Sequence, residues 1–153
     1  MVTTLWKLDL TTIPQPLGSN TRIKGGPLFD LVKLQEMLKT GALNLGDSNQ
    51  FWVATKSCEH DLEHKLRWSP GDQLTKFIQV LRPAAFPKGD FVNSQWCKDF
   101  DGQFNACDSY KVRIDEGTWK RDVNAPLYYL KFSIDQADVI YLALISCHLD
   151  KAF

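Results

Sequence analysis

Apolar and polar residues alternate most clearly near the C-terminal end of the chain. The segment 127–148 has two apolar runs around a short polar stretch, which is typical of two strands joined by a tight turn. We place this turn at Gln136–Ala137, so that Ile134 pairs with Val139. One face of the first strand is then apolar and should face a core. Its residues are Tyr128, Leu130, Phe132 and Ile134.

The opposite face of the first strand is polar, and the predicted register places the apolar Ile140, Leu142 and Leu144 of the second strand on the same side, so that this face is at most partly open. Tyr129 and Lys131 point to this side, and the predicted register adds His148. The strand that precedes them in the sequence can add two further cations, Lys111 and Arg113. Cations, a phenol and an imidazole on one surface suit a ligand that carries phosphate. A turn of three residues instead of two would move His148 to the other face.

Helical spacing dominates the first half of the chain. Leucines repeat along one face of the segment 28–41, which ends in a glycine, a typical helix stop. Residues 50–55 are short and apolar enough for a strand. Ser57 can cap a short helix, and Ser69 followed by Pro70 predicts the start of another, which Pro83 ends.

The remaining segments complete the predicted fold. Residues 1–27 contain several prolines and glycines and predict an irregular N-terminal extension, apart from a short strand near residues 5–10. Residues 83–105 predict a long ordered loop, and residues 107–115 alternate as a half-buried strand does. Because helices precede strands, we expect a single α+β domain over 1–153, with N-terminal helices packed on one face of a C-terminal antiparallel sheet.

Composition narrows the classes of function. The chain has 153 residues, of which 44% are hydrophobic, enough for one domain with a substantial core. Lysine plus arginine equals aspartate plus glutamate, so the strong positive charge of many nucleic-acid-binding proteins is absent. We find neither a membrane-spanning segment nor a signal peptide, and therefore expect a cytoplasmic protein without a membrane partner. The widely spaced cysteines indicate small buried residues.

Several short motifs follow one another in order between residues 31 and 148. They are a helix that ends in glycine, a polar segment, a phenylalanine-x-lysine, a tryptophan followed by an aspartate, a tyrosine-leucine-lysine strand and a strand that ends in histidine. Their positions are Leu34–Gly41, Ala54–Ser57, Phe86–Lys88, Trp96–Asp99, Tyr129–Lys131 and Ser146–His148. This order resembles the motility quorum-sensing regulator (MqsR) toxins, RelE-like mRNA interferases that are neutralised by a small antitoxin. The family has glutamine after the tryptophan, where this chain has Cys97.

The resemblance implies a RelE/MqsR-like fold and a metal-independent endoribonuclease toxin that cleaves mRNA without a cofactor. Its partners would be RNA and an antitoxin protein. Such cleavage requires proton transfer and cations that stabilise the charge on phosphate. An imidazole suits proton transfer near neutral pH, and aromatic rings can stack on unpaired bases. The implied catalytic residues are Lys88, Tyr129, Lys131 and His148. The implied RNA-binding residues are Trp96, Lys111 and Arg113.

Two alternatives remain open at this point. Neutral charge and a high aromatic content also fit a non-catalytic protein-interaction module, such as an inhibitor or an immunity-type protein. His60 and His64 lie one helical turn apart, a spacing that can bind a metal ion and would suit a metal-dependent nuclease. Asp61 follows His60, so this segment lacks the H-E-x-x-H motif of zinc proteases.

Overall fold

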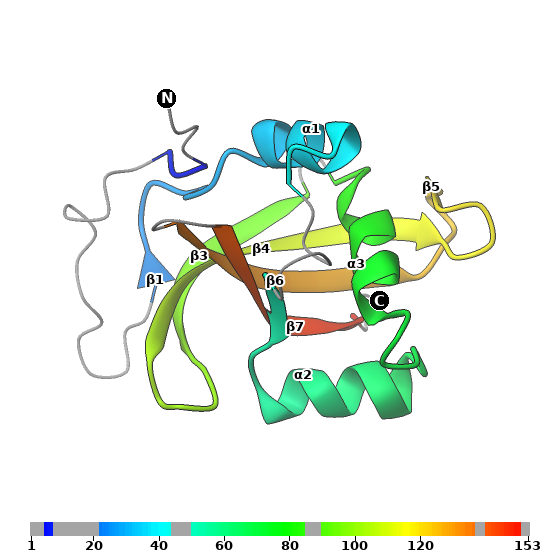
Figure 1. Cartoon of the computed structure of the whole chain (residues 1–153). Coiled ribbons are helices and arrows are strands. Elements are labelled where there is room, and N and C mark those ends of the chain that lie inside the picture. Colours follow the sequence, from blue (N-terminus) through cyan, green and yellow to red (C-terminus); the bar gives the residue numbers. More distant parts are fainter. Residues whose placement is uncertain (1–4, 8–21, 44–49, 85–89, 137–139, 151–153) are drawn as a thin grey trace.

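The computed structural model describes residues 5–7, 22–43, 50–84, 90–136 and 140–150. These residues form helices and one open sheet, and the fold belongs to the α+β class as predicted (Figure 1). The helices are α1 (Leu31–Thr40), α2 (Lys56–His60), which continues into the π-helical turn η2 (Asp61–Lys65), and α3 (Gln73–Leu81). The strands are β1 (Arg22–Ile23), β2 (Phe51–Val53), β3 (Phe91–Lys98), β4 (Phe104–Asp115), β5 (Lys120–Arg121), β6 (Leu127–Gln136) and β7 (Ile140–Leu149). No described helix is long and apolar enough to cross a membrane.

Helix α1 begins later than predicted and ends where predicted. The amides of Leu28 and Phe29 donate to the Asp108 carboxylate on β4, so these residues lie against the sheet instead of entering the helix. Asp30 caps the helix by accepting a hydrogen bond from the Lys33 amide at 3.0 Å. Gly41 ends it with φ 81°, a left-handed conformation that favours glycine.

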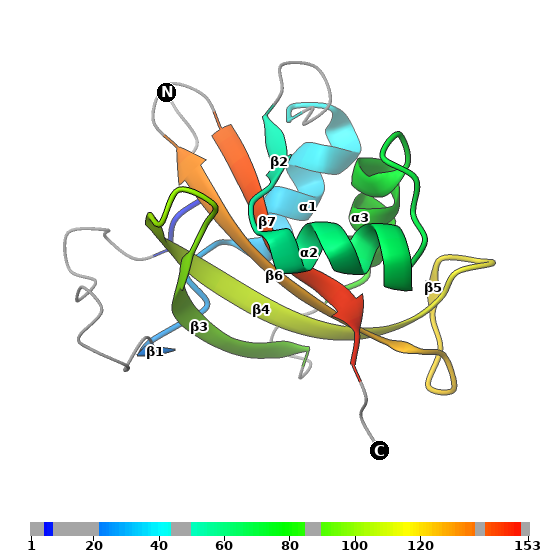
Figure 2. The same ribbon diagram turned by 90° about the horizontal axis from the view of Figure 1, so that it is seen from below.

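The two later helices use different start residues from those predicted. Thr55, and not Ser57, caps α2, because its Oγ1 accepts the Cys58 amide at 3.1 Å. Ser69 forms a turn with Asp72, in which the two side chains lie 2.8 Å apart, and α3 therefore begins only at Gln73. Helix α3 ends at Leu81 with Arg82 as its C-cap, directly before Pro83, as predicted. Figure 2 shows α2 lying beside β7.

The predicted loop at 83–105 was wrong, because most of its second half is strand β3 and the start of β4. Ser94 and Trp96 point into the protein, while Gln95 and Cys97 point to the other side. A buried serine obscured this alternation in the sequence. Ser94 is tolerated there because its hydroxyl donates to the Asp108 carboxylate at 2.7 Å. Strand β1 also pairs with β3, so the predicted N-terminal extension contributes to the sheet.

The sheet is mixed, whereas the sequence predicted an antiparallel one. Its strand order is β1-β3-β4-β6-β7-β2, with β5 paired to β4. Strand β2 runs parallel to β7, with Phe51 beside Leu142 and Val53 beside Leu144. The other pairings are antiparallel. The short apolar pattern of β2 predicts a strand but carries no information about its direction.

The register of the β6–β7 hairpin differs from the prediction, and yet His148 lies on the predicted face. Ile134 pairs with Leu142 instead of Val139, and the intervening turn residues 137–139 lie outside the described residues. That change alone would turn His148 to the opposite side. A bulge shifts the pairing beyond Lys131, so that Tyr129 pairs with His148. The bulge adds one residue on β7 and restores the original face.

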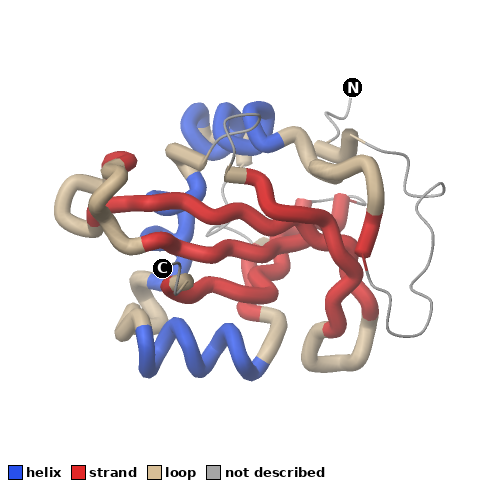
Figure 3. The backbone as a smooth tube through the Cα atoms, turned by 180° about the vertical axis from the view of Figure 1, so that it is seen from behind, coloured by secondary structure: helices blue, strands red, loops and turns tan. Residues whose placement is uncertain are grey.

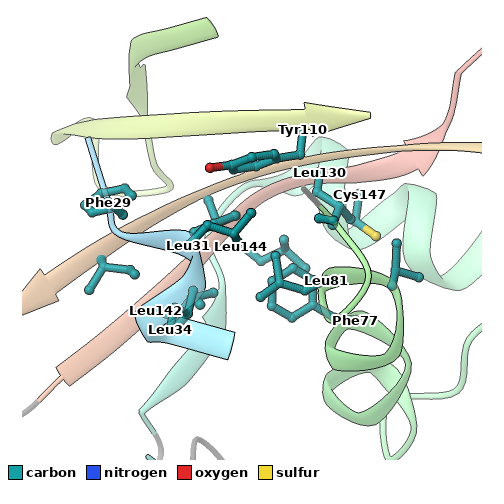
Figure 4. Packing of buried hydrophobic residues seen from close by; sticks show 14 of the residues in the cluster. Phe29, Leu31, Leu34, Phe77, Leu81, Tyr110, Leu130, Leu142, Leu144 and Cys147 are labelled. Carbon is teal, nitrogen blue, oxygen red and sulfur yellow. The ribbon is translucent and has the colours of Figure 1, made fainter. Parts of the chain in front are cut away.

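The main core lies between the sheet and helices α1 and α3 (Figure 4). The Phe132 ring is central to it, with centroids of Phe29, Phe77 and Tyr110 at 6.1, 6.2 and 6.1 Å. Tyr128, Leu130, Phe132 and Ile134 all belong to this core, as their alternation predicted.

Candidate functional site

The face of the sheet turned away from the main core carries most of the predicted site residues. Successive strand residues point to opposite sides, so the burial of Tyr128 and Leu130 directs Tyr129 and Lys131 outward. Figure 3 views the sheet from this side, and among the described residues no helix crosses in front of β3, β4 and β6. We call this surface the polar face. Its side chains include Gln95, Cys97, Lys111, Arg113, Tyr129, Lys131, Ser146 and His148, and the buried Cys107 and Ser109 point to the same side.

Tyr129 and His148 form a stacked pair across β6 and β7. Their ring centroids are 5.1 Å apart and their planes are 18° from parallel. The Tyr129 hydroxyl donates to Ser109 Oγ at 3.1 Å, which fixes the phenol over β4. His148 Nδ1 lies 3.0 Å from the carbonyl oxygen of Leu149. Since a carbonyl only accepts, Nδ1 carries the hydrogen in that bond, and Nε2 is left to accept a proton.

Lys131 lies beside this pair and is half-buried. Its Nζ donates to Gln95 Oε1 at 3.0 Å and lies 5.6 Å from the centre of the Tyr129 ring. Burial lowers the pKa of Lys131, but nearby Cys97 and Tyr129 outweigh it, and the pKa is raised overall. The ammonium group therefore stays charged at neutral pH and can stabilise an anion on this face.

A pocket of about 330 Å³ adjoins Tyr129 on the β4 side. Lys111, which pairs with Tyr129 across β4 and β6, forms part of its wall. The complete lining is Asp90, Lys111, Arg113, Arg121, Asp122, Val123 and Leu127. The pocket thus combines three cations, two carboxylates and two apolar side chains, which suits a ligand with both anionic and apolar parts.

Several pocket cations already have partners. Lys111 Nζ forms an ion pair with Asp150 Oδ2 at 2.7 Å, and Arg121 forms one with Asp90. The Arg121–Asp90 hydrogen bond raises the pKa of Arg121. Arg113 donates to the carbonyl oxygen of Ala125 at 2.9 Å and makes no ion pair with a carboxylate among the described residues. Of these three cations, Arg113 is therefore the one that can bind an anionic ligand without first breaking an ion pair.

One predicted site residue does not join the polar face, and another falls outside the described residues. Trp96 is 9% exposed and belongs to the main core, because it alternates with Gln95 and Cys97 on β3. Its ring cannot stack on a base in this arrangement, so we leave Trp96 out of the proposed site. Lys88 lies outside the described residues.

The alternative metal pair lies elsewhere in the molecule. His60 and His64 are on α2 and η2, with ring centroids 4.8 Å apart, as the helical spacing predicted. Among the described residues, no group of three or more His, Cys, Asp or Glu side chains is arranged to hold a metal ion. The nearest acid contact is between His64 Nε2 and Glu63, at 4.0 Å on the surface.

Sequence reasoning missed Gln95, Cys97 and Arg121 as neighbours of the site. Gln95 and Cys97 were assigned to a loop, and only the alternation of Ser94 and Trp96 could have identified their strand. Cys97 is half-buried, and a hydrogen bond with Cys107 lowers its pKa to about 7. The nearby Lys131 ammonium also lowers the pKa, while burial opposes the shift.

Comparison with known proteins does not assign the chain to a family. No family model matches it, and neither the curated proteins nor the solved structures yield a match. The case for a function therefore depends on the polar face and on the sequence motifs.

Proposed function

We propose that the chain is a metal-independent endoribonuclease that binds RNA on the polar face. The observation that carries the proposal is the stacked Tyr129–His148 pair with the Lys131 ammonium beside it. A base, a hydroxyl and a cation on one helix-free surface are the groups that cleavage of a phosphodiester requires. The motif order that resembles the MqsR toxins, a RelE-like group, supports the same assignment.

The proposed reaction begins when the ribose 2′-oxygen attacks the adjacent phosphorus. His148 Nε2 takes the 2′-hydroxyl proton, and the bond from phosphorus to the 5′-oxygen breaks. Tyr129 Oη protonates the departing oxygen, and Lys131 stabilises the charge that develops on the phosphate. The products are a 2′,3′-cyclic phosphate and a 5′-hydroxyl, so neither metal nor water is consumed in this step.

Lys111 and Arg113 would hold the phosphates next to the cleaved bond. Both line the pocket beside Tyr129, and in an extended strand their side chains point to the same side. RNA phosphate would replace Asp150 as the partner of Lys111. A local cluster of cations can bind RNA in this way although the net charge of the chain is zero. Binding should weaken as salt concentration rises.

The resemblance also suggests how such an enzyme would be controlled. We propose that a small antitoxin protein binds this chain in the cytoplasm and blocks the polar face. Cells that make the chain without this partner would stop growing, whereas cells that make both would grow normally.

The test compares matched variants in growth and in RNA cleavage by pure protein. Each site variant has a control of the same residue type on the exposed surface. The site variants are Tyr129→Phe, Lys131→Ala and His148→Ala, and their controls are Tyr141→Phe, Lys120→Ala and His64→Ala. Site variants should cleave roughly 100-fold more slowly or worse, and controls should cleave like the wild type.

The outcome decides between the proposal and its rivals. Absence of both growth arrest and RNA cleavage for the wild-type chain would overturn the proposal. Cleavage that EDTA abolishes would instead favour a metal-dependent nuclease. Equal cleavage by His148→Ala and His64→Ala would remove His148 from the mechanism.

One observation favours a non-catalytic protein-interaction module as the second candidate. The ion pairs Lys111–Asp150 and Arg121–Asp90 give the pocket region mixed charge, which is common where proteins bind proteins. This candidate predicts capture of a specific protein through the polar face together with no loss of RNA. Lys111→Glu should then weaken protein binding, while RNA stays intact with every variant.

A further inference from the structure

Two thiols and a lysine meet on the polar face between β3, β4 and β6. Cys97 pairs with Asn105 and Cys107 pairs with Gln95, so the two cysteines are diagonal neighbours on one side of the hairpin. Lys131 reaches the same side from β6, where its Nζ donates to Oε1 of Gln95 at 3.0 Å, two residues before Cys97 on β3. Cys107 is buried, whereas Cys97 is partly exposed. Cys97 is therefore the thiol that a reagent in solution can reach.

Lys131 lacks the partner that a half-buried ammonium group usually has. Within the described part of the chain it makes no ion pair with a carboxylate, and its hydrogen bond goes to the neutral amide of Gln95. The ionisable groups that act on its charge are Cys97, Tyr129 and Cys107. A thiolate at Cys97 would form an ion pair with the Lys131 ammonium group.

The Cys107 thiol also favours a thiolate at Cys97. Burial raises the pKa of Cys107 well above its usual value, so Cys107 keeps its proton. While Cys97 is neutral, the Cys107 thiol donates to the carbonyl oxygen of Asn105, which lies 3.3 Å from Cys107 Sγ. Once Cys97 ionises, its thiolate is the stronger acceptor, and the Cys107 thiol can donate to it.

We propose that Cys97 is a covalent modification site that reacts with small-molecule disulfides. The Cys97 thiolate attacks one sulfur of the disulfide, a new sulfur–sulfur bond forms, and the original one breaks. The departing thiolate takes a proton from water. Cys97 is oxidised to a mixed disulfide, and half of the small disulfide is reduced to a thiol.

The adduct should persist instead of passing to Cys107. Diagonal neighbours in a β-ladder have Cα atoms about 7 Å apart, at the limit of what a disulfide spans. The mixed disulfide with the small thiol is therefore the expected product. It would lie beside Lys131 on the polar face, so any RNA cleavage there should fall with modification, a consequence that rests on the proposed function.

The experiment treats the pure full chain with dithiodipyridine and follows the released thiopyridone and the intact mass. Oxidised glutathione then serves as a second, physiological probe. We expect one fast adduct on the native wild-type chain and none on Cys97→Ser. Cys58→Ser is the matched control, because burial raises the pKa of Cys58 to about 12 and its loss should leave the fast reaction unchanged.

Lys131→Gln tests the role of the cation. The charges and thiols that face Cys97 are Lys131 on β6 and Cys107 on β4. The fast reaction should slow roughly 10-fold at neutral pH, and the midpoint of its pH profile should move upward. An unchanged rate and midpoint would overturn the role of Lys131, provided that circular dichroism shows a folded variant.

The covalent site and the proposed function can fail separately. A native chain that forms no fast adduct, or forms it equally in Cys97→Ser, overturns the modification site whatever RNA cleavage shows. An adduct on Cys97 in a chain that cleaves no RNA supports the site and contradicts only the proposed function.

Discussion

Removal of the Asp108 carboxylate should destabilise the fold more than its small size suggests. Asp108 lies on β4 at the core face, where it accepts hydrogen bonds from the amides of Leu28 and Phe29 and from the Ser94 hydroxyl. These bonds hold the segment before α1 against the sheet. Asp108→Ala would leave two buried amides without acceptors.

The cost follows from these contacts. Each orphaned buried amide costs about 1–3 kcal/mol, and release of a buried carboxylate offsets part of the sum. We expect a net loss of about 3 kcal/mol in unfolding free energy. For a domain of this length the thermal midpoint should fall by roughly 6–12 °C. Urea unfolding followed by tryptophan fluorescence measures the change, since Trp68 and Trp96 are buried.

Two variants serve as comparisons. In Asp108→Asn the amide oxygen can still accept from Leu28 and Phe29, and the NH₂ group can donate to Ser94, so we expect a loss of about 1 kcal/mol or less. Asp101→Ala, on the exposed hairpin turn, should cost under about 0.5 kcal/mol. If Asp108→Ala cost no more than Asp101→Ala, the anchoring role of Asp108 would be refuted.

Three further predictions follow from the buried groups. Burial raises the pKa of Asp108 in the folded chain above 3.8, its ordinary value. The protonated side chain therefore stabilises the fold below pH 3.8, and this contribution is lost as the pH rises through the folded-state pKa. The stability advantage of the wild type over Asp108→Asn should therefore shrink between about pH 3 and pH 7 in urea unfolding, and an advantage that grows would contradict this pKa shift. The Tyr110 hydroxyl is buried and has no hydrogen-bond partner among the described residues, so Tyr110→Phe should leave stability unchanged or raise it by about 1 kcal/mol, and a loss above about 1 kcal/mol would reveal a hidden partner. A Cβ at Gly26 would lie 2.0 Å from Ser94 Oγ, so Gly26→Ala should cost about 1–3 kcal/mol in thermal unfolding, whereas Gly71→Ala, which meets no atom within 4 Å, should cost far less.

Local patterns predicted those parts of the fold that depend on neighbours in sequence. The alternation in β6 identified the core residues from Tyr128 to Ile134, and Gly41 marked the end of α1. The same alternation separated Tyr129 and Lys131 from the core. These features follow from side-chain periodicity and from the conformational freedom of glycine, both of which can be read over a few residues.

Elements that depend on distant contacts were predicted poorly. Strand β3 was taken for a loop because its inward residue Ser94 is polar, and only Asp108 on the next strand makes that burial favourable. Trp96 was included in the predicted site because the sequence did not show which face of the sheet its side chain points to. Likewise, the start of α1 depends on hydrogen bonds from Leu28 and Phe29 to a residue 80 and 79 positions away.

The sequence by itself determined that β6 has one apolar and one polar side, but the predicted register wrongly put Leu142 and Leu144 of β7 on the polar side, and both lie in the main core. Only the tertiary structure decided which residues meet across the C-terminal hairpin. The turn and the bulge each shift the pairing by an odd number of residues, so His148 returns to the side of Tyr129 although every predicted partner was different. Side-chain orientation along a strand follows from local backbone geometry, whereas register and strand direction follow from packing between segments far apart in the chain.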